Sequence, residues 1–219
     1  MKYKQLPGYL QILIIVAGLL LAAALNWRHL WAGHLIRKSR ASFAAGDYKK
    51  TADILNEAAS TDPENPDVWW RLCSAYRFAG EFDLALKACK RQVQLLPHDW
   101  KSYRDLGYVY LGKTDFAQAA AAFGEATLLS SDFELHDFYV RSLLASKQYD
   151  KAIPAAQRLL ELAKIPGPDH DSAYEYLGIA YAKTRQRNKA QEAFRNEHVG
   201  SCELTTDESD MDVDCVGNN

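Results

Sequence analysis

The sequence predicts an all-α protein in which one long apolar helix leads into a stack of about five helical hairpins. Apolar and small residues recur at helical spacing with a period of about 34 residues, from residue 32 to residue 198. Short polar breaks divide each period into two helical stretches. Two helices that each carry one apolar face bury those faces against each other, so the repeated unit is a hairpin and the stack is an α-solenoid.

The first predicted element is an apolar run from Tyr9 to Leu25, which follows Pro7. Counted from Pro7 the run has 19 residues, which at about 1.5 Å per residue nearly crosses a hydrocarbon core of about 30 Å. Aromatic residues flank the run on both sides, with tyrosines at its start and Trp27 and Trp31 beyond its end. Aromatic side chains at these positions anchor a membrane helix at the lipid–water interface. Residues 9–25 therefore predict a single-pass membrane segment.

A cleaved signal peptide is the alternative interpretation of this run. The segment Ala22-Ala23-Ala24 offers a small-residue cleavage site. No helix breaker or polar region precedes that site, however, and nothing forces the chain out of a helix before Ala45. We therefore expect a retained membrane helix that continues into the first hairpin.

The membrane orientation rests on two weaker features. Two basic side chains precede the apolar run and four follow it closely, which favours a cytoplasmic location for the rest of the chain. The four cysteines, Cys73, Cys89, Cys202 and Cys215, form no CxxC pair and match no zinc-ligand spacing. Interpreted as unpaired thiols, they also favour the cytoplasm, and the side of the membrane is left open.

The repeat is clearest at one position of the second helix in each hairpin. This position reads Leu55, Cys89, Phe123, Ala156 and Phe194, with spacings of 34, 34, 33 and 38 residues. The longest step contains the loop KIPGPDHD, from Lys164 to Asp171, in which proline and glycine interrupt the helical pattern. Aromatic, small and apolar residues at these positions are expected to form the core.

These motifs resemble the tetratricopeptide repeat (TPR). The clearest unit matches its consensus at Tyr103, Leu106, Gly107, Tyr110, Phe116, Ala119, Phe123 and Ala126. The next clearest match it at Trp69, Leu72, Tyr76, Gly80, Phe82, Ala85 and Pro97, and at Tyr174, Leu177, Gly178, Tyr181, Ala190 and Phe194. The resemblance implies a solenoid over residues 28–198 with units at 32–65, 66–99, 100–132, 133–166 and 171–198. Residues 1–27 precede it as the membrane segment with its short basic flank.

The resemblance also implies that the first helices of the hairpins line a concave groove. The residues expected to bind a partner there are Trp70, Arg71, Arg77, Lys101, Arg104, Tyr108 and Arg141. Arginine and aromatic side chains are frequent anchors in protein interfaces, so the expected ligand is a peptide or partner helix with an acidic stretch. An ordinary solvated helix face is the alternative. The ninth positions of the units contain no Asn, so the carboxylate clamp of chaperone-binding members is not expected.

Other functional classes find little support in the sequence. Residues 47–198 carry 20 basic and 22 acidic side chains, a balance that gives no reason to expect a nucleic-acid partner. Phosphate-binding glycine loops, HExxH and Ser-His-Asp patterns are absent from the sequence. We therefore expect no enzyme, no cofactor, no metal site and no small-molecule substrate. The acidic segment 199–219 is predicted to be disordered.

Together these features predict a membrane-anchored, non-catalytic adaptor or scaffold that binds a partner protein through the groove. The alternative is an exported soluble TPR protein, released by signal-peptide cleavage, that serves as an accessory or assembly factor of an envelope enzyme or secretion complex.

Overall fold

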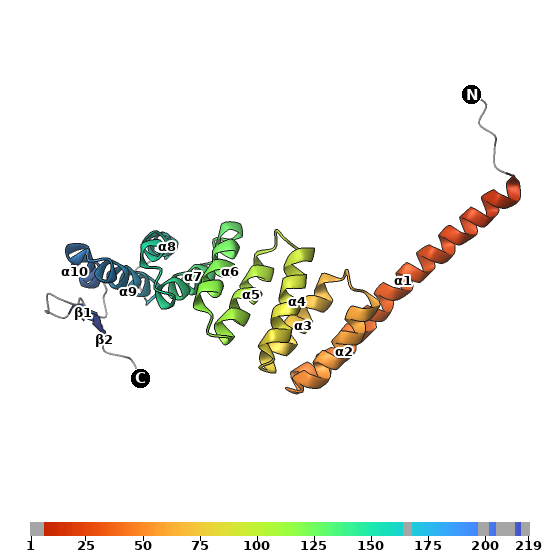
Figure 1. The fold of residues 1–219 in the computed structure, drawn as a ribbon, viewed down its shortest axis with the longest axis horizontal. Coiled ribbons are helices and arrows are strands. Elements are labelled where there is room, and N and C mark those ends of the chain that lie inside the picture. Colours follow the sequence, from red (N-terminus) through yellow and green to blue (C-terminus); the bar gives the residue numbers. More distant parts are fainter. Residues whose placement is uncertain (1–6, 164–167, 197–201, 205–212, 216–219) are drawn as a thin grey trace, which may run out of the picture. The chain divides into compact units, whose positions relative to one another are not determined.

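The computed structural model describes residues 7–163, 168–196, 202–204 and 213–215. Within these residues the chain forms ten helices and two short strands (Figure 1). The helices are α1 (Gly8–Ala44), α2 (Tyr48–Thr61), α3 (Pro66–Phe78), α4 (Phe82–Leu95), α5 (Trp100–Gly112), α6 (Phe116–Leu129), α7 (Phe133–Ala145), α8 (Tyr149–Leu162), α9 (Pro168–Lys183) and α10 (Arg187–Asn196). They pack as five successive hairpins, which confirms the predicted all-α solenoid class.

The hairpins belong to two compact units. Unit 1, Met1–Leu95, contains α1 to α4, and α2 packs against both α1 and α3. Unit 2, Leu96–Asn219, contains α5 to α10, in which each helix packs against the next. Each unit therefore buries its apolar faces between neighbouring helices, as a solenoid of short repeats does.

Side-chain caps mark where many of the helices begin. The capping residues are Asp47, Asn65, Asp99, Asp115 and Asp132. Each side-chain carboxylate or amide oxygen accepts a hydrogen bond from a backbone N–H in the first turn of the helix that follows. Because the first N–H groups of a helix have no intrahelical acceptor, these caps fix helix starts locally.

The turn inside each hairpin has the same geometry in all five. The turn residues with positive φ are Gly46, Gly80, Thr114, Lys147 and Arg185. In each case the N–H of the turn residue bonds to the carbonyl three residues back, and the next N–H bonds to the carbonyl five residues back. This is the Schellman arrangement that ends many helices. Thr114, a β-branched residue, adopts φ 56° there, although such residues rarely do. The hairpin therefore imposes this conformation on whichever residue occupies the turn.

Each hairpin has a buried residue on its first helix and another 16 positions later on its second helix, and we name the two the closure pair. In the second, third and fifth hairpins the two residues meet directly. The five pairs are Ser39 and Leu55, Cys73 and Cys89, Gly107 and Phe123, Val140 and Ala156, and Gly178 and Phe194. A Cβ atom added to Gly107 would lie 2.7 Å from the Phe123 ring. The Phe194 ring fills the equivalent space over Gly178. In these two hairpins the ring therefore needs a first helix without a side chain at that point.

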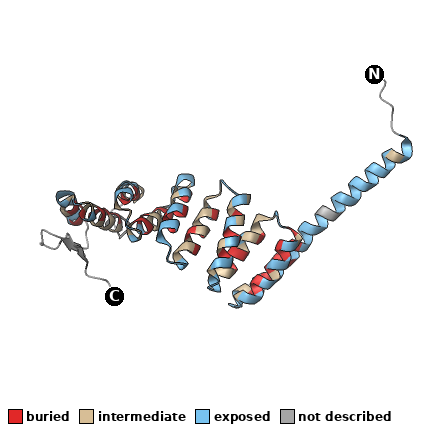
Figure 2. Cartoon of the chain, in the orientation of Figure 1, coloured by how far each residue is buried: buried red, intermediate tan, exposed pale blue. Residues whose placement is uncertain are grey.

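Helix α1 continues without a break from the predicted membrane segment into the first hairpin, as expected from the sequence. Its early side chains, such as Ile12 and Leu20, are exposed, whereas Ala32 and Leu35 are buried (Figure 2). The Nδ1 atom of His29 lies 2.6 Å from a carboxylate oxygen of Asp62, at the end of α2. Helix α1 is long and apolar enough to cross a membrane, a property that a signal sequence shares.

One sequence-based interpretation needs correction. Cys73 and Cys89 were expected to be unpaired thiols, but they form a disulfide between α3 and α4. Spacing along the chain could not reveal the bond, because it depends on how the two helices face each other. Disorder of the acidic segment 199–219 stays a prediction, and among its described residues β1 (Cys202–Leu204) pairs antiparallel with β2 (Val213–Cys215). Backbone pairing supplies hydrogen bonds that an acidic composition does not forbid. The rest of that segment lies outside the described residues.

Replacing Gly107 with alanine tests the closure pair of the third hairpin. Because the Phe123 ring must move to accept the new methyl group, Gly107→Ala should lower the unfolding free energy of unit 2 by about 1–3 kcal/mol. Thermal unfolding of the chain in detergent, followed by circular dichroism, measures the change. The control is Gly33→Ala, where the nearest atom is 3.8 Å away. Equal effects of the two substitutions would contradict the argument.

Protonation of His136 should make unit 2 sensitive to acid. His136 is buried on α7, and burial lowers its pKa from the usual 6.5, against the opposing effects of a Ser130 backbone hydrogen bond and of Asp132. Below pH 6.5 His136 therefore binds a proton more readily in the unfolded chain than in the folded chain. The unfolding free energy should consequently decrease as the pH is lowered. Urea titrations across this range should give a smaller pH dependence for His136→Asn. The exposed His98→Asn serves as a control that keeps the full dependence, and identical slopes for all three proteins would refute the role of His136.

Candidate functional site

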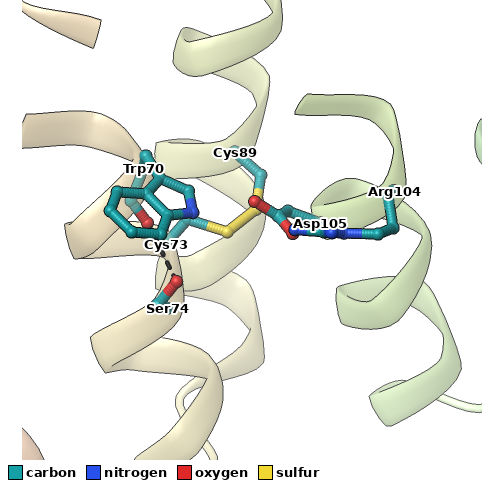
Figure 3. Close-up of a disulfide and its surroundings, with 6 residues drawn as sticks. All are labelled: Trp70, Cys73, Ser74, Cys89, Arg104 and Asp105. Carbon is teal, nitrogen blue, oxygen red and sulfur yellow. Dashed lines mark hydrogen bonds and ion pairs between the residues drawn. A yellow bond between two sulfur atoms is a disulfide. The ribbon is translucent and has the colours of Figure 1, made fainter. Parts of the chain in front are cut away.

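In unit 1 the predicted groove residues lie on α3. The Trp70 side chain is 38% exposed, and the Arg71 guanidinium lies 4.7 Å from the centre of its ring. The Arg71 Nε atom also pairs with Asp67 at 3.2 Å. The Ser74 hydroxyl donates to the Trp70 carbonyl, next to the Cys73–Cys89 disulfide (Figure 3). Trp70 and Arg71 therefore form one surface in which a cation rests on an accessible aromatic ring.

Arg77 belongs to a different aromatic cluster of unit 1. Its guanidinium lies 4.3 Å from the centre of the Phe78 ring, at the end of α3. Phe78 in turn stacks on Tyr48 at 5.4 Å and meets the edge of Phe43 at 5.6 Å. Arg77 is thus two helical turns along α3 from Trp70, and the Phe78 ring that it contacts packs on Phe43 and Tyr48 of the first hairpin.

In unit 2 four predicted residues form a chain of cations and rings together with two residues that were not predicted. Its members, which we call the α5–α7 ladder, are Trp100, Lys101, Arg104, Tyr108, Phe138 and Arg141. Arg104 lies 5.2 Å from the Trp100 ring centre and 6.0 Å from that of Tyr108. The Tyr108 ring meets Phe138 edge-on at 5.1 Å, and Arg141 lies 5.7 Å from the Phe138 ring. The ladder therefore joins the first helices of two consecutive hairpins.

Neighbouring carboxylates reduce the positive charge of the ladder. Arg104 pairs with the buried Asp105 at 2.9 Å, and Arg141 lies 3.6 Å from Asp137. The Tyr176 hydroxyl on α9 donates to Asp137 at 2.9 Å. Burial and the nearby Asp137 carboxylate raise the pKa of Tyr176, so its phenol stays protonated as a donor. The surface is accordingly less basic than its sequence alone predicts, and its charged groups are held in place.

A cavity of about 160 Å³ opens beside the end of the ladder. Its lining residues are Leu111, Phe116, Phe138, Arg141, Ser142 and Ala145. Most of these side chains are apolar, while Arg141 remains 58% exposed at the same place. The cavity can therefore accept an apolar group of a ligand whose neighbouring acidic group meets Arg141.

Sequence reasoning missed Trp100, Phe138 and Asp105 of this surface. The missed rings stand four residues before Arg104 and three before Arg141, spacings that place side chains together on a helix. Asp137 stands four residues before Arg141 by the same rule. The repeat consensus identifies the residues that face the groove. It does not identify the residues three or four positions away on the same helix, whose side chains lie beside each arginine. A further hollow of about 570 Å³, also missed, is lined by Lys147, Gln148, Tyr149, Asp150, Lys151, Lys183 and Thr184.

Comparison with known proteins supports the repeat assignment. Two family models, both described as tetratricopeptide repeat, match residues 42–106 and 140–198. Over 98 residues the chain is 32% identical to the Hsp70-Hsp90 organizing protein of Triticum aestivum. That stretch is 44% of this chain but only 17% of the wheat protein, so the chain spans a small part of its relative.

Solved structures give the same fold. MamA has a TM-score of 0.67 at 19% identity, over 78% of this chain and 92% of that chain. MamA of Desulfovibrio magneticus has a TM-score of 0.63 at 17% identity, over 78% and 94%. YrrB, described as a TPR protein with an unusual peptide-binding site, has a TM-score of 0.63 at 16% identity, over 74% and 82%. At these identities the likeness concerns the fold, and together with the two family models it establishes that the chain contains tetratricopeptide repeats.

Proposed function

We propose that the chain is a membrane-anchored, non-catalytic adaptor that binds a segment of a partner protein through the first helices of its hairpins. The observation that carries this proposal is the α5–α7 ladder with the cavity beside it. Cations stacked on partly exposed rings next to an apolar hollow are the features of a protein-binding hot spot. The names of two similar proteins support it, since YrrB is described as having a peptide-binding site and the wheat protein is an Hsp70-Hsp90 organizing protein.

The geometry also favours a particular kind of ligand. Arg104 and Arg141 already share their charge with Asp105 and Asp137, so an acidic ligand must compete with these carboxylates or share the arginines with them. Electrostatic attraction alone is therefore insufficient, and an apolar side chain in the cavity must contribute to binding. The ligand that fits best is an extended peptide or helix with an apolar residue beside an acidic one.

The anchor in this proposal is the exposed apolar part of α1. Described apolar side chains of α1 such as Ile12, Leu20 and Trp27 are more than 60% exposed, and burial begins at Ala32. Such a surface needs an apolar environment, and a lipid bilayer provides it. The alternative is a cleaved signal, in which case the repeats act as an exported accessory or assembly factor of an envelope enzyme or secretion complex.

Charge reversal on the first helices tests the partner surface. Arg71→Glu/Arg104→Glu should reduce the recovery of crosslinked partners about tenfold, which corresponds to about 1.4 kcal/mol of binding free energy. A crosslinking pull-down with the full chain in membranes measures the recovery of partners by the variant and by the wild type. The matched control, Lys90→Glu/Arg158→Glu, makes the same change in charge on α4 and α8, outside the proposed surface. Recovery of the same partners at equal yield by both variants would show that the surface is not the binding site.

Intact mass decides between the anchor and the alternative. After cell lysis without detergent, the proposed adaptor should remain in the membrane fraction, and its mass after detergent extraction should include residues 1–24. The alternative predicts a soluble protein whose mass lacks those residues. A truncated mass in the soluble fraction would remove the anchor from the proposal and leave the partner surface unaffected.

A further inference from the structure

The disulfide of unit 1 occupies the closure pair of the second hairpin. Cys73 on α3 and Cys89 on α4 stand where the third hairpin has Gly107 and Phe123. The two Cα atoms are 5.1 Å apart, within the usual range of about 4.4–6.8 Å for disulfides. The hairpin thus brings the two sulfur atoms together through the same packing that the other hairpins use, and the bond links its helices covalently (Figure 3).

Burial determines when this bond can form and break. Both cysteines are 0% exposed in the folded hairpin, so neither sulfur atom can be reached by a dissolved thiol or oxidant. Oxidation must therefore occur while the hairpin is still open, and the closed hairpin afterwards protects the bond. In addition, the register of β1 and β2 makes the Cα atoms of Cys202 and Cys215 partners. The backbone thus groups all four cysteines of the chain into two pairs.

We propose that the repeats reside in an oxidising compartment, on the far side of the membrane to which α1 directs the chain. There a disulfide-bonded oxidoreductase is the oxidant. The thiolate of one cysteine attacks the donor disulfide and forms a mixed disulfide, and the thiolate of the other then attacks the protein sulfur of that bond. The Cys73–Cys89 bond forms, and the donor leaves as a dithiol that has gained the two electrons and the two protons of the cysteine thiols. This location holds for a retained anchor and for a cleaved signal, and it does not depend on the partner surface.

The proposal reverses the orientation that the basic residues favour. The basic residues after the apolar run include Arg28, Arg37, Lys38 and Arg40, and all lie within α1. The positive-inside preference is counted over loops that flank a membrane helix, and residues from Ala32 onward instead pack in the folded first hairpin. A buried disulfide is stronger evidence for the compartment, because cytosolic thiols are normally kept reduced.

Differential alkylation of the full chain tests the proposal. The chain is expressed in bacterial cells with and without their periplasmic disulfide donor, and the cells are quenched with acid. Free thiols are blocked under denaturing conditions with N-ethylmaleimide, disulfides are reduced, and the released thiols receive an isotopically heavy maleimide. Peptide mass spectrometry should find Cys73 and Cys89 with the heavy label in cells that contain the donor, and with the light label in cells that lack it. Protease added to intact spheroplasts should digest the repeats.

The control variant transfers the closure pair of the third hairpin into the second. Cys73→Gly/Cys89→Phe supplies the Gly107 and Phe123 residue types and needs no oxidant, so its amount should be equal in the two strains. The amount of the wild-type chain should fall severalfold without the donor. The proposal is overturned if both cysteines carry the light label in donor-containing cells, or if protease reaches the repeats only after lysis. These readouts concern the wild-type chain and hold even if the variant fails to accumulate.

Discussion

The contact between two buried residues 16 positions apart is the constraint on which the rest of this structure depends. The contact lies where the two helices of a hairpin meet, and different hairpins make it with different residue types. A glycine accepts a phenylalanine ring, two cysteines form a bond, and Val140 packs in the same core as Ala156. Each solution places buried atoms in the space between the helices, as close packing requires. The residue types change, whereas the spacing and the turn that follows the first helix are retained.

The candidate partner surface depends on the same contact. The Phe123 ring, which covers Gly107 on one side, stacks on Phe138 at 5.5 Å and meets Tyr108 edge-on at 5.5 Å. Those two rings are members of the α5–α7 ladder, and they hold Arg104 and Arg141 in place. A residue of the core therefore positions the groups that are exposed to a ligand. A change at the closure pair should consequently alter partner binding as well as stability, because it moves the rings that support the arginines.

The sequence predicted the hairpins well because their signal is local and repeated. The second-helix positions from Leu55 to Phe194 and the polar breaks gave the helices and their order. The partner of each such residue on the first helix was not predicted, because periodicity identifies the buried face of a helix and not what it meets. Cys73 and Cys89 illustrate this limit, because a sequence does not distinguish a buried free thiol from a disulfide-bonded cysteine. Similarly, the arginines of the groove were predicted, but their pairing with Asp105 and Asp137 depends on side-chain geometry.

A double-mutant cycle in the fourth hairpin measures directly whether the closure pair acts as a unit. Ala156→Phe alone places a ring against Val140 in a filled core, and Val140→Gly alone removes packing. The combination recreates the glycine and phenylalanine of the third and fifth hairpins. The account predicts that the double variant unfolds at a higher urea concentration than the sum of the single effects allows, with a coupling of at least about 1 kcal/mol. Additive effects would contradict it, because the two positions would then not share one space.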